Sequence, residues 1–327
     1  MDFAPAVYEH AARLINKTPW EVSRSGSLLY DAHSEAFRCY RHSPVVIGID
    51  IYNIEAEAYG AIIGEPEGAG VPAVSRPVCT STNDIPSLKQ YNPSVDGRMP
   101  MVLETAKRFA AAHPDADVRV PVSGPFSIAA ALVGLNTLLC EAVTDPDDVR
   151  KALVHLAAAQ EEFCRAIVNA GLGVSLFESA ATPPLLSPDD FRGMELPALA
   201  GLIAAASATA GKPVPCIIGG NTAPIVESLL ETGTMYVICP SETDQALFMK
   251  TMERYPDVVV RVNMDPKVLT LADIWKAFEE IDRIVELSAV RQHTCIGTGV
   301  LPYEAIPATV LKARDYALTR GRGIKRL

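Results

Sequence analysis

The sequence predicts an α/β fold, a (β/α)8 barrel with an N-terminal helical extension, and three observations support that prediction. Strand-like runs rich in β-branched residues alternate with amphipathic helical patterns along the chain. Such alternation implies βαβ units and a parallel sheet, either open or closed into a barrel. Six or seven later strands recur along the chain, and that number favours a barrel. The 327 residues also suit a single barrel domain.

The first 43 residues are predicted to form a helical arm and loop that precede the barrel. Pro5–Ile15 has a helical pattern with proline at its start, and the polar stretch Thr18–Ser27 is typical of a loop. We therefore expect one barrel domain over residues 1–327, with residues 1–43 as its arm.

The predicted strands are short apolar runs, as expected of parallel strands that are covered on both faces. The first is Pro44–Asp50, which ends on an aspartate. The others are Val118–Val122, Gly173–Phe177, Val214–Ile218, Met235–Cys239, Val258–Val262 and His293–Ile296. Gly68–Tyr91, rich in Gly, Pro, Ser and Thr, is predicted to be a long loop or hairpin beside the barrel mouth.

The predicted helices fill the intervals between these strands. Asp145-Pro146 combines an N-cap with proline at the first helical position, and Ser187-Pro188 opens a second helix in the same way. Further helices are expected at Thr222–Glu231, Thr243–Arg254, Ala272–Leu287 and Tyr303–Leu318. The most apolar stretch, Phe126–Val143, is interrupted by polar residues, so a membrane span is not expected.

Charge and cysteine content exclude some classes of function. The formal net charge is −10 and the basic residues are scattered, which argues against a nucleic-acid partner. Seven cysteines at irregular spacing indicate reduced thiols and a cytoplasmic protein. Dinucleotide-binding, Walker, nucleophile-elbow and zinc-protease motifs are not found.

In a parallel barrel the active site forms at the carboxyl ends of the strands, so the polar residues there are the candidates. Asp50 is either a helix cap or a catalytic, ligand-orienting carboxylate. Asn221 has the same two interpretations, and Asp265 can be only a turn residue. The whole group is Asp50, Asn53, Ser123, Glu178, Asn221, Thr222, Cys239, Glu242, Asn263, Asp265 and Thr298.

Cys239 differs from the other cysteines by its position. A cysteine is most often a small buried hydrophobic residue. Cys239, however, ends a predicted strand and has Glu242 three residues further on, so a thiolate or metal role stays open beside the structural one.

Several strand-end segments, taken in order, resemble the uroporphyrinogen decarboxylase superfamily. They are Ser43–Asn53, Glu55–Gly60, Ser123–Ser127, Gly219–Thr222, Asn263–Pro266 and Gly297–Pro302. The resemblance covers nearly the whole chain and implies a barrel. The superfamily also includes methylcobamide:thiol methyltransferases and the methyl-transferring components of O-demethylases, and we expect this chain to be closer to that branch.

The features that the resemblance implies for the decarboxylases are only partly present. Asp50 matches the aspartate that binds pyrrole nitrogens, but the arginine-rich loop is reduced to Arg24. Gly-Thr-Gly with Thr298 replaces the usual Gly-His-Gly. An octa-anionic substrate would then lack counterions, so decarboxylation of uroporphyrinogen is not expected.

The resemblance to the thiol methyltransferases implies a zinc site, and its usual ligands are missing. Ile217, Gly219 and Thr298 occupy the matching positions. O-demethylase-type members use carboxylates among their zinc ligands, which suggests Glu178, Cys239 and Glu242 as a metal set here. A zinc ion there would act as a Lewis acid.

The sequence thus predicts a methyltransferase that moves a methyl group between a small methyl ether, alcohol or thiol and a corrinoid (cobalamin) on a separate protein. One alternative is a decarboxylase or other lyase acting on a small acid or a tetrapyrrole. Another is a non-catalytic binding subunit, and a homodimer is possible. The candidate catalytic residues are Asp50, Asn53, Glu178, Asn221 and Asp265, and the cofactor-side candidates are Ser123, Phe126 and Thr298.

Overall fold

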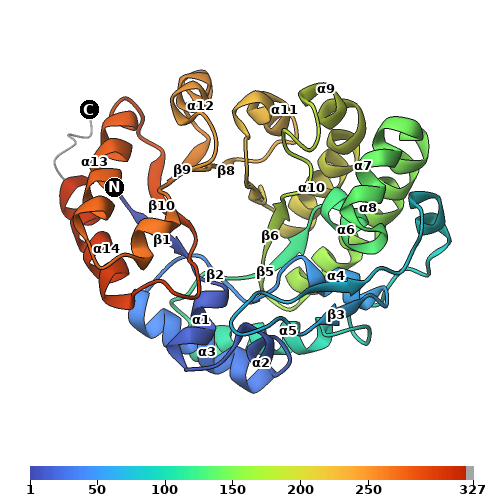
Figure 1. The fold of residues 1–327 in the computed structure, drawn as a ribbon, viewed down its shortest axis with the longest axis horizontal. Coiled ribbons are helices and arrows are strands. Elements are labelled where there is room, and N and C mark those ends of the chain that lie inside the picture. The colour runs from blue at the N-terminus through green and yellow to red at the C-terminus, as the bar shows by residue number, and fades with distance from the viewer. Residues whose placement is uncertain (322–327) are drawn as a thin grey trace.

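The computed structural model describes residues 1–321, and its centre is a barrel of parallel strands surrounded by helices (Figure 1). Two four-stranded parallel sheets, in the orders β1-β10-β9-β8 and β2-β5-β6-β7, make up the wall. The wall strands are β1 (Phe3–Ala6), β2 (Val45–Val46), β5 (Val118–Ser123), β6 (Gly173–Glu178), β7 (Cys216–Ile218), β8 (Tyr236–Cys239), β9 (Val259–Asn263) and β10 (Thr294–Val300). The predicted barrel is confirmed.

The two sheets enclose one interior. Tyr8, which follows β1, makes an edge-on ring contact with Phe177 of β6, with the ring centroids 6.0 Å apart. Val46 and Ile51 join them in a small apolar cluster inside the barrel. The larger core lies outside the wall, between strands and helices, because alternate strand residues point to opposite faces.

The N-terminal segment differs from its prediction. Phe3–Ala6 is strand β1, so the helix expected over Pro5–Ile15 was wrong at its start, and helix α1 covers Glu9–Leu14. Hydrogen bonds to β10 override the local pattern: Ile296 N donates to Asp2 O at 2.9 Å and Leu301 N donates to Ala6 O at 3.0 Å. Residues 1–43 therefore supply a barrel strand as well as helices α1, α2 (Pro19–Ser23) and α3 (Gly26–Tyr40).

The remaining helices surround the wall much as the sequence predicts. They are α4 (Asn53–Ala58), α5 (Met99–Ala112), α6 (Pro125–Val133), α7 (Leu135–Thr144), α8 (Pro146–Asn169), α9 (Pro188–Asp190), α10 (Leu196–Ala210), α11 (Val226–Leu230), α12 (Gln245–Met252), α13 (Trp275–Leu287) and α14 (Pro307–Gly321). Short helical turns are η1 (Thr82–Ser87), η2 (Phe191–Glu195), η3 (Ala223–Ile225) and η4 (Pro266–Thr270). The hairpin β3 (Ile62–Gly64) and β4 (Ala73–Arg76) contains the start of the predicted loop.

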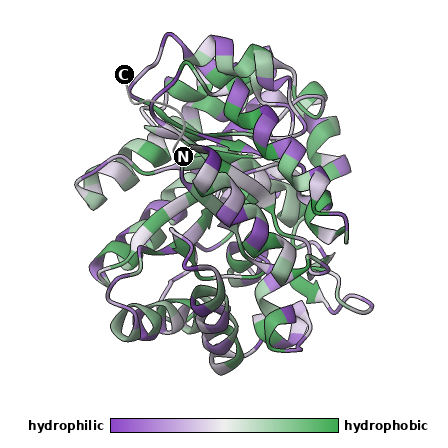
Figure 2. Ribbon diagram, turned by 90° about the vertical axis from the view of Figure 1, so that its left-hand side faces the viewer, coloured by the Kyte–Doolittle hydropathy of each residue, from purple (hydrophilic) through white to green (hydrophobic). Residues whose placement is uncertain are grey.

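Two apolar stretches have the composition of membrane helices. Phe126–Val143 folds into α6 and α7, which are bent by 111° at Gly134, a residue with a φ of +87°. Pro188–Ala210 is the one helix in residues 1–321 that is long and apolar enough to span a membrane. Its α10 part buries Leu199, Leu202 and Ile203 in the core, which accounts for its composition. Figure 2 shows hydrophobic strands in the interior and, around them, helices that carry both hydrophobic and hydrophilic residues.

Candidate functional site

A pocket of about 460 Å³ opens at the carboxyl ends of the strands, where a barrel enzyme places its active site. Its walls are largely apolar, and its polar members come from several strands and from α1. The lining residues are Ala6, Tyr8, Glu9, Ile49, Asp50, Ile51, Tyr52, Asn53, Val71, Pro72, Phe177, Ile217, Gly219, Ile238, Pro240, Glu242, Arg261, Asn263, Pro266, Gly299 and Val300.

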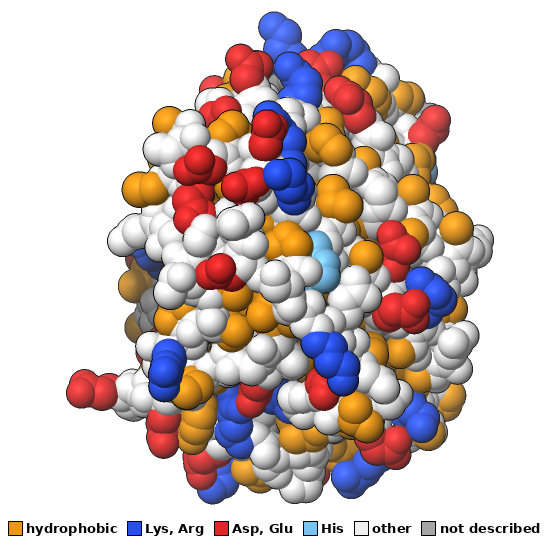
Figure 3. Space-filling view, turned by 90° about the vertical axis from the view of Figure 1, so that its right-hand side faces the viewer, with side chains coloured by type: hydrophobic (Ala, Val, Ile, Leu, Met, Phe, Trp, Pro, Cys, Tyr) orange, Lys and Arg blue, Asp and Glu red, His pale blue; other side chains and the backbone are white. Residues whose placement is uncertain are grey.

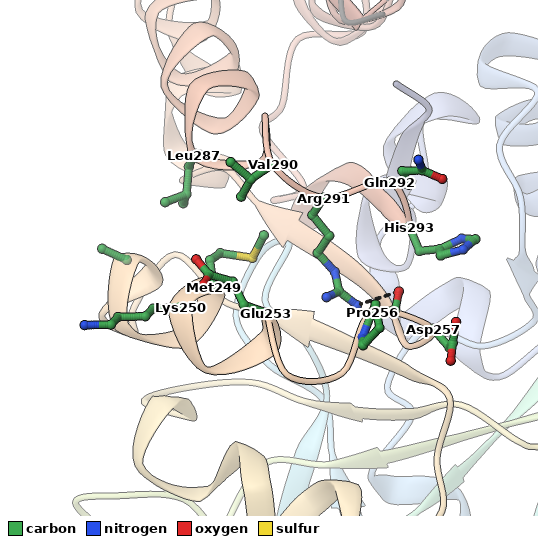
Figure 4. Close-up of a pocket in the computed structure, with 11 residues that line it drawn as sticks. Met249, Lys250, Glu253, Pro256, Asp257, Leu287, Val290, Arg291, Gln292 and His293 are labelled. Atoms are coloured by element: carbon green, nitrogen blue, oxygen red, sulfur yellow. Dashed lines mark hydrogen bonds between the residues drawn. The ribbon is translucent and has the colours of Figure 1, made fainter. Parts of the chain in front are cut away.

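Two larger cavities, each of about 730 Å³, lie elsewhere. One is at the opposite end of the barrel, where the strands begin. The other lies between α12 and the segment that joins α13 to β10 (Figure 4). There Arg291 donates to the carbonyls of Met252 at 2.5 Å and Tyr255 at 2.7 Å, and also to that of Val258. Its guanidinium is thereby used to hold the loop, so the mouth pocket remains the candidate site.

Asp50 lies in the mouth pocket but is already paired. Arg98, which directly precedes α5, donates to both carboxylate oxygens of Asp50 at 2.5 Å. Asn53 donates to Asp50 at 3.1 Å and to Pro72 O at 2.6 Å. A bidentate arginine pair of this kind fixes the carboxylate and neutralises it. The structure therefore brings Asp50 and Asn53 together, and shows Asp50 as an anchored anion rather than a free one.

The charge network extends from Arg98 to the N-terminal arm. Arg98 also donates to Glu57 at 2.6 Å, and Arg24 donates to the other oxygen of Glu57 at 2.5 Å. Arg24 stacks on Trp20, with the guanidinium carbon 4.5 Å from the ring centroid. Both arginines that lie near Asp50 are thus committed to carboxylates of the protein.

Arg261 and Asn263 form the other polar side of the pocket. They are two residues apart on β9, so both side chains point into the barrel, whereas Val260 and Val262 are fully buried on the outer face. Gly297 of β10 makes room for them, because a Cβ there would lie 2.7 Å from Arg261 Cγ and would clash with Asn263 Oδ1. Asn263 Oδ1 and Arg261 Nε are buried and have no hydrogen-bond partner.

Glu9 is a titratable carboxyl at the pocket rim. Burial raises the pKa of Glu9 to about 7, helped by the charge of Glu304. A group with a pKa near neutrality can hold or release a proton at physiological pH, which general acid–base catalysis requires. Sequence analysis did not single out Glu9, because it lies in the helical arm and not after a strand of the expected barrel.

Glu178 is absent from the pocket. It ends β6 on the outer face, where it accepts from Ser127 Oγ and from the backbone N of Ala180 at 3.0 Å. Glu195 and Cys216 lie beside it, and all three side chains are fully buried. Burial raises the pKa of Glu178, and burial together with the neighbouring Glu178 charge raises the pKa of Glu195 well above its usual range.

The predicted metal set is not assembled. Cys239 is fully buried on the outer face of β8, packed in the core outside the wall, and Glu178 is on the outer face of β6. Only Glu242 reaches the pocket, where it is exposed. Over residues 1–321 no three His, Cys, Asp or Glu side chains are grouped so that they can hold a metal ion. The predicted metal set was wrong because successive strand residues point to opposite faces, so a residue that ends a strand can point away from the barrel interior.

The three cofactor-side candidates are buried away from the pocket. Ser123 donates through its backbone N to Glu55 at 2.7 Å and through its hydroxyl to the same carboxyl at 3.0 Å. Phe126 is a fully buried core residue of α6. Thr298 accepts from Ala6 N at 3.2 Å and donates to Gly299 O at 2.8 Å. Their contacts are structural and hold β1, α4 and α6 against the wall.

Asn221 and Asp265 both make structural contacts, but the helix cap expected for Asn221 is wrong, because Thr222 is the N-cap of η3. Asn221 Oδ1 accepts from the Thr243 hydroxyl at 2.9 Å, which ties two loops together. Asp265 caps η4 by accepting from Lys267 N at 2.9 Å. Neither lines the pocket.

Besides Glu9, the two arginines of the site, Arg98 and Arg261, were not identified from the sequence. The sequence could have indicated Arg261, because it is a cation within the apolar run Val258–Val262 and lies two positions before Asn263, on the same face of the strand. Arg98 has none, because it lies 48 residues after Asp50 in a segment without a strand pattern.

Comparison with known families identifies the chain. Residues 4–304 match the family model described as uroporphyrinogen decarboxylase (URO-D). The chain belongs to the uroporphyrinogen decarboxylase family. No curated protein matches the chain.

Solved structures share the fold at low sequence identity. A methyltransferase from Methanosarcina mazei superposes with a TM-score of 0.81 at 18% identity, covering 95% of this chain and 91% of that one. A B12-independent methionine synthase from Shewanella sp. W3-18-1 gives 0.55 at 13% identity, with 90% and 86% covered. A putative vitamin-B12 independent methionine synthase from Listeria monocytogenes gives 0.51 at 11%, with 100% and 98% covered.

Proposed function

We propose that this member of the uroporphyrinogen decarboxylase family transfers a methyl group between a small molecule and a corrinoid carried by a separate protein. The observation that carries the proposal is the small, mostly apolar mouth pocket in which Asp50 is already neutralised by Arg98. The similarity in fold to a protein described as a methyltransferase supports it.

The charges of the pocket argue against a porphyrinogen substrate. Asp50 has both oxygens on Arg98, so it is occupied where a decarboxylase would need it for pyrrole nitrogens. Arg24 and Arg98 are bound to Glu57 and Asp50. Among the residues that line the pocket, Arg261 is the one cation, which is too little charge for eight carboxylates.

The rim of the pocket is suited to contact with a partner. Val71 is 45% exposed and Val300 is 47% exposed, and both line the pocket, as do Pro72 and Pro240. A corrinoid presented by its own protein would cover these apolar side chains and bring the methyl carrier to the substrate. The face shown in Figure 3 has acidic and basic side chains interspersed over it.

Acid–base chemistry is assigned to Glu9 and not to zinc, because the donor set for zinc does not fit. When a methyl group leaves an oxygen or sulfur atom, that atom gains negative charge, which a nearby proton relieves. The half-buried Glu9 carboxyl can supply this proton, and in the reverse direction it can accept the proton of a thiol. The apolar walls exclude water from the reacting atoms. The cysteines among residues 1–321 are free thiols, which suits the reducing cytoplasm that we propose as its location.

The test is spectroscopic. The protein is incubated with cob(I)alamin and methanol, anisole or dimethyl sulfide, and separately with methylcobalamin and 2-mercaptoethanol or 3-mercaptopropionate. We expect the visible spectrum to show methylcobalamin formed in at least one of the first reactions or consumed in one of the second. No change in any of them contradicts the proposal.

Variants of the rim show which carboxyl is used. Glu9→Gln is expected to slow the reaction at least tenfold. Glu304→Gln is the matched control: it keeps the reacting carboxyl, and the pKa of Glu9 falls because the repelling charge is gone. The control should therefore keep its maximal rate while its pH profile moves to lower pH.

A second candidate is a lyase that decarboxylates a small acid, and the unpaired Arg261 favours it. It would act without a corrinoid. Release of CO2 from a small carboxylic acid, with no change in the cobalamin spectrum, would support this alternative over methyl transfer.

A further inference from the structure

Arg261 is a buried cation without a counterion. Its side chain is 8% exposed, and no carboxylate of residues 1–321 forms a salt bridge with it. The carboxylates of the pocket are otherwise engaged or distant: Asp50 pairs with Arg98, and the exposed Glu242 accepts from Ser241. A buried charge without a partner is strongly unfavourable, so a partner from outside the chain is expected at this position.

The groups that surround Arg261 are neutral. Tyr236, Tyr8 and Cys295 act on it most strongly, and burial raises the pKa of all three, that of Tyr236 to about 12. They can contact the guanidinium without cancelling its charge. Glu9, the third carboxyl that lines the pocket, forms no salt bridge with Arg261. The inner part of the pocket is therefore positively charged.

The order of residues on β9 places the positive charge of Arg261 deep in the pocket. β9 runs toward the mouth, so Arg261 lies one layer deeper than Asn263 on the same inward face. Asn263 adds an amide whose Oδ1 atom has no partner, and its amide group can turn to offer an N–H. Gly297 of β10 lies against both side chains, and its lack of a Cβ is what lets them occupy this position. The pocket walls around them are apolar, with Phe177, Ile217 and Ile238, the last of which pairs in register with Arg261.

We propose that Arg261, assisted by Asn263, binds the carboxylate of a small substrate with an apolar body, and that the acid points to the floor of the pocket. Arginine and a carboxylate make paired hydrogen bonds, and a partly buried site strengthens them. The other end of the molecule then faces the mouth, beside Glu9 and the apolar rim. The role of this acid as a substrate rests on the proposed function; its binding does not.

The experiment compares acids with uncharged isosteres of the same shape, in the absence of any corrinoid. Benzoate, benzamide, butyrate, butyramide and inorganic phosphate are titrated into the wild-type protein by calorimetry. We expect both carboxylates to bind at least tenfold more tightly than their amides, and phosphate to bind weakly because it has no apolar body. Equal binding of acid and amide overturns the proposal, and so does a preference for phosphate.

Substitution of Arg261 locates the effect. Arg261→Gln should weaken benzoate at least tenfold and leave benzamide within twofold of the wild type. Arg165→Gln, on the exposed face of α8, is the matched control and should change neither. Asn263→Ala should weaken benzoate three- to tenfold. Benzoate binding that survives both pocket substitutions contradicts the assignment.

A stability readout separates ligand binding from a structural role. Without ligand, Arg261→Gln should melt at or above the wild-type temperature, because it removes an unpaired buried charge. An arginine needed for folding would lower the melting temperature, and that result would count against the proposal. If benzoate binds as expected but no methyl transfer is found with any donor, the substrate class stands and the proposed function fails.

Discussion

The two faces of the barrel wall use polar residues in opposite ways. On the inner face, Arg261 and Asn263 open onto the pocket and keep atoms without partners. On the outer face, Glu178 is enclosed by Ser127 and backbone N–H groups, and Cys239 is packed in the core. A strand residue and its neighbour lie on opposite faces, so a polar residue that ends a strand is not by that fact a site residue. The four predictions that follow test this division.

The largest effect is expected from Arg98→Ala, which leaves Asp50 buried without its counterion. Removing one partner of a buried pair costs about 3–5 kcal/mol. The free energy of unfolding in urea should fall by that amount, and ligand binding in the pocket should fall with it. Arg38→Ala removes an exposed pair with Glu35 and should cost less than about 1 kcal/mol. Equal losses of unfolding free energy in the two variants would contradict the assignment of Asp50–Arg98 as a buried ion pair of the inner face.

Glu55, held by Ser123 behind the wall, should make stability depend on pH. Burial raises the pKa of Glu55 to about 7, from an ordinary value near 4.5. A carboxyl whose pKa is higher in the folded than in the unfolded state stabilises the fold at pH values below its unfolded-state pKa. This contribution is lost as the pH rises through the folded-state pKa of about 7. Its share of the loss is about 3 kcal/mol, at 1.36 kcal/mol for each unit of pKa.

Urea unfolding at pH 5 and pH 8 measures this change. Glu55→Gln keeps the shape without the charge and should show a smaller decrease between the two pH values. Glu104→Gln is the control, because Glu104 is exposed on α5 and should leave the decrease as it is in the wild type. A Glu55→Gln variant with the wild-type decrease would mean that this carboxyl is ionised in the fold.

A moderate effect on stability, without any effect on the pocket, is expected from Cys239→Ser. The substitution places a hydroxyl in an apolar environment on the outer face, at a cost of about 1–3 kcal/mol. Methyl transfer and benzoate binding should stay within twofold of the wild type. Cys140→Ser, at an exposed position, is the control for the loss of a thiol. If Cys239→Ser lost activity while its melting temperature stayed unchanged, Cys239 would have to be a residue of the functional site.

The smallest effect is expected from Asp265→Ala. Loss of the η4 cap should cost about 1 kcal/mol in urea unfolding, and substrate binding should be unchanged because Asp265 does not line the pocket. Asp265→Asn keeps a capping side chain and should recover most of the stability. A binding defect that Asn does not restore would place Asp265 at the inner face.

Whether a predicted site residue lies in the pocket depends on which face of the barrel wall its side chain occupies. This criterion separates the predicted residues that line the pocket from those that do not. Asp50 and Asn53 were predicted at the mouth and lie there, because they follow a strand on its inner side. Glu178 and Cys239 have the same relation to their strands in the sequence and face outward. Short strands of two to seven residues show too little alternation for the face to be deduced from the pattern.

The sequence by itself determined the alternating strands and helices, the barrel and the family, because periodicity and ordered strand-end motifs are local properties. Strand β1 required the tertiary structure, since only pairing with β10 outweighs the helical pattern of Pro5–Ile15. The partners of charged residues required it as well: Arg98 meets Asp50 from 48 positions away, and Arg261 forms no salt bridge with any carboxylate of residues 1–321. Electrostatic contacts depend on distances in space, and these the folded chain alone sets.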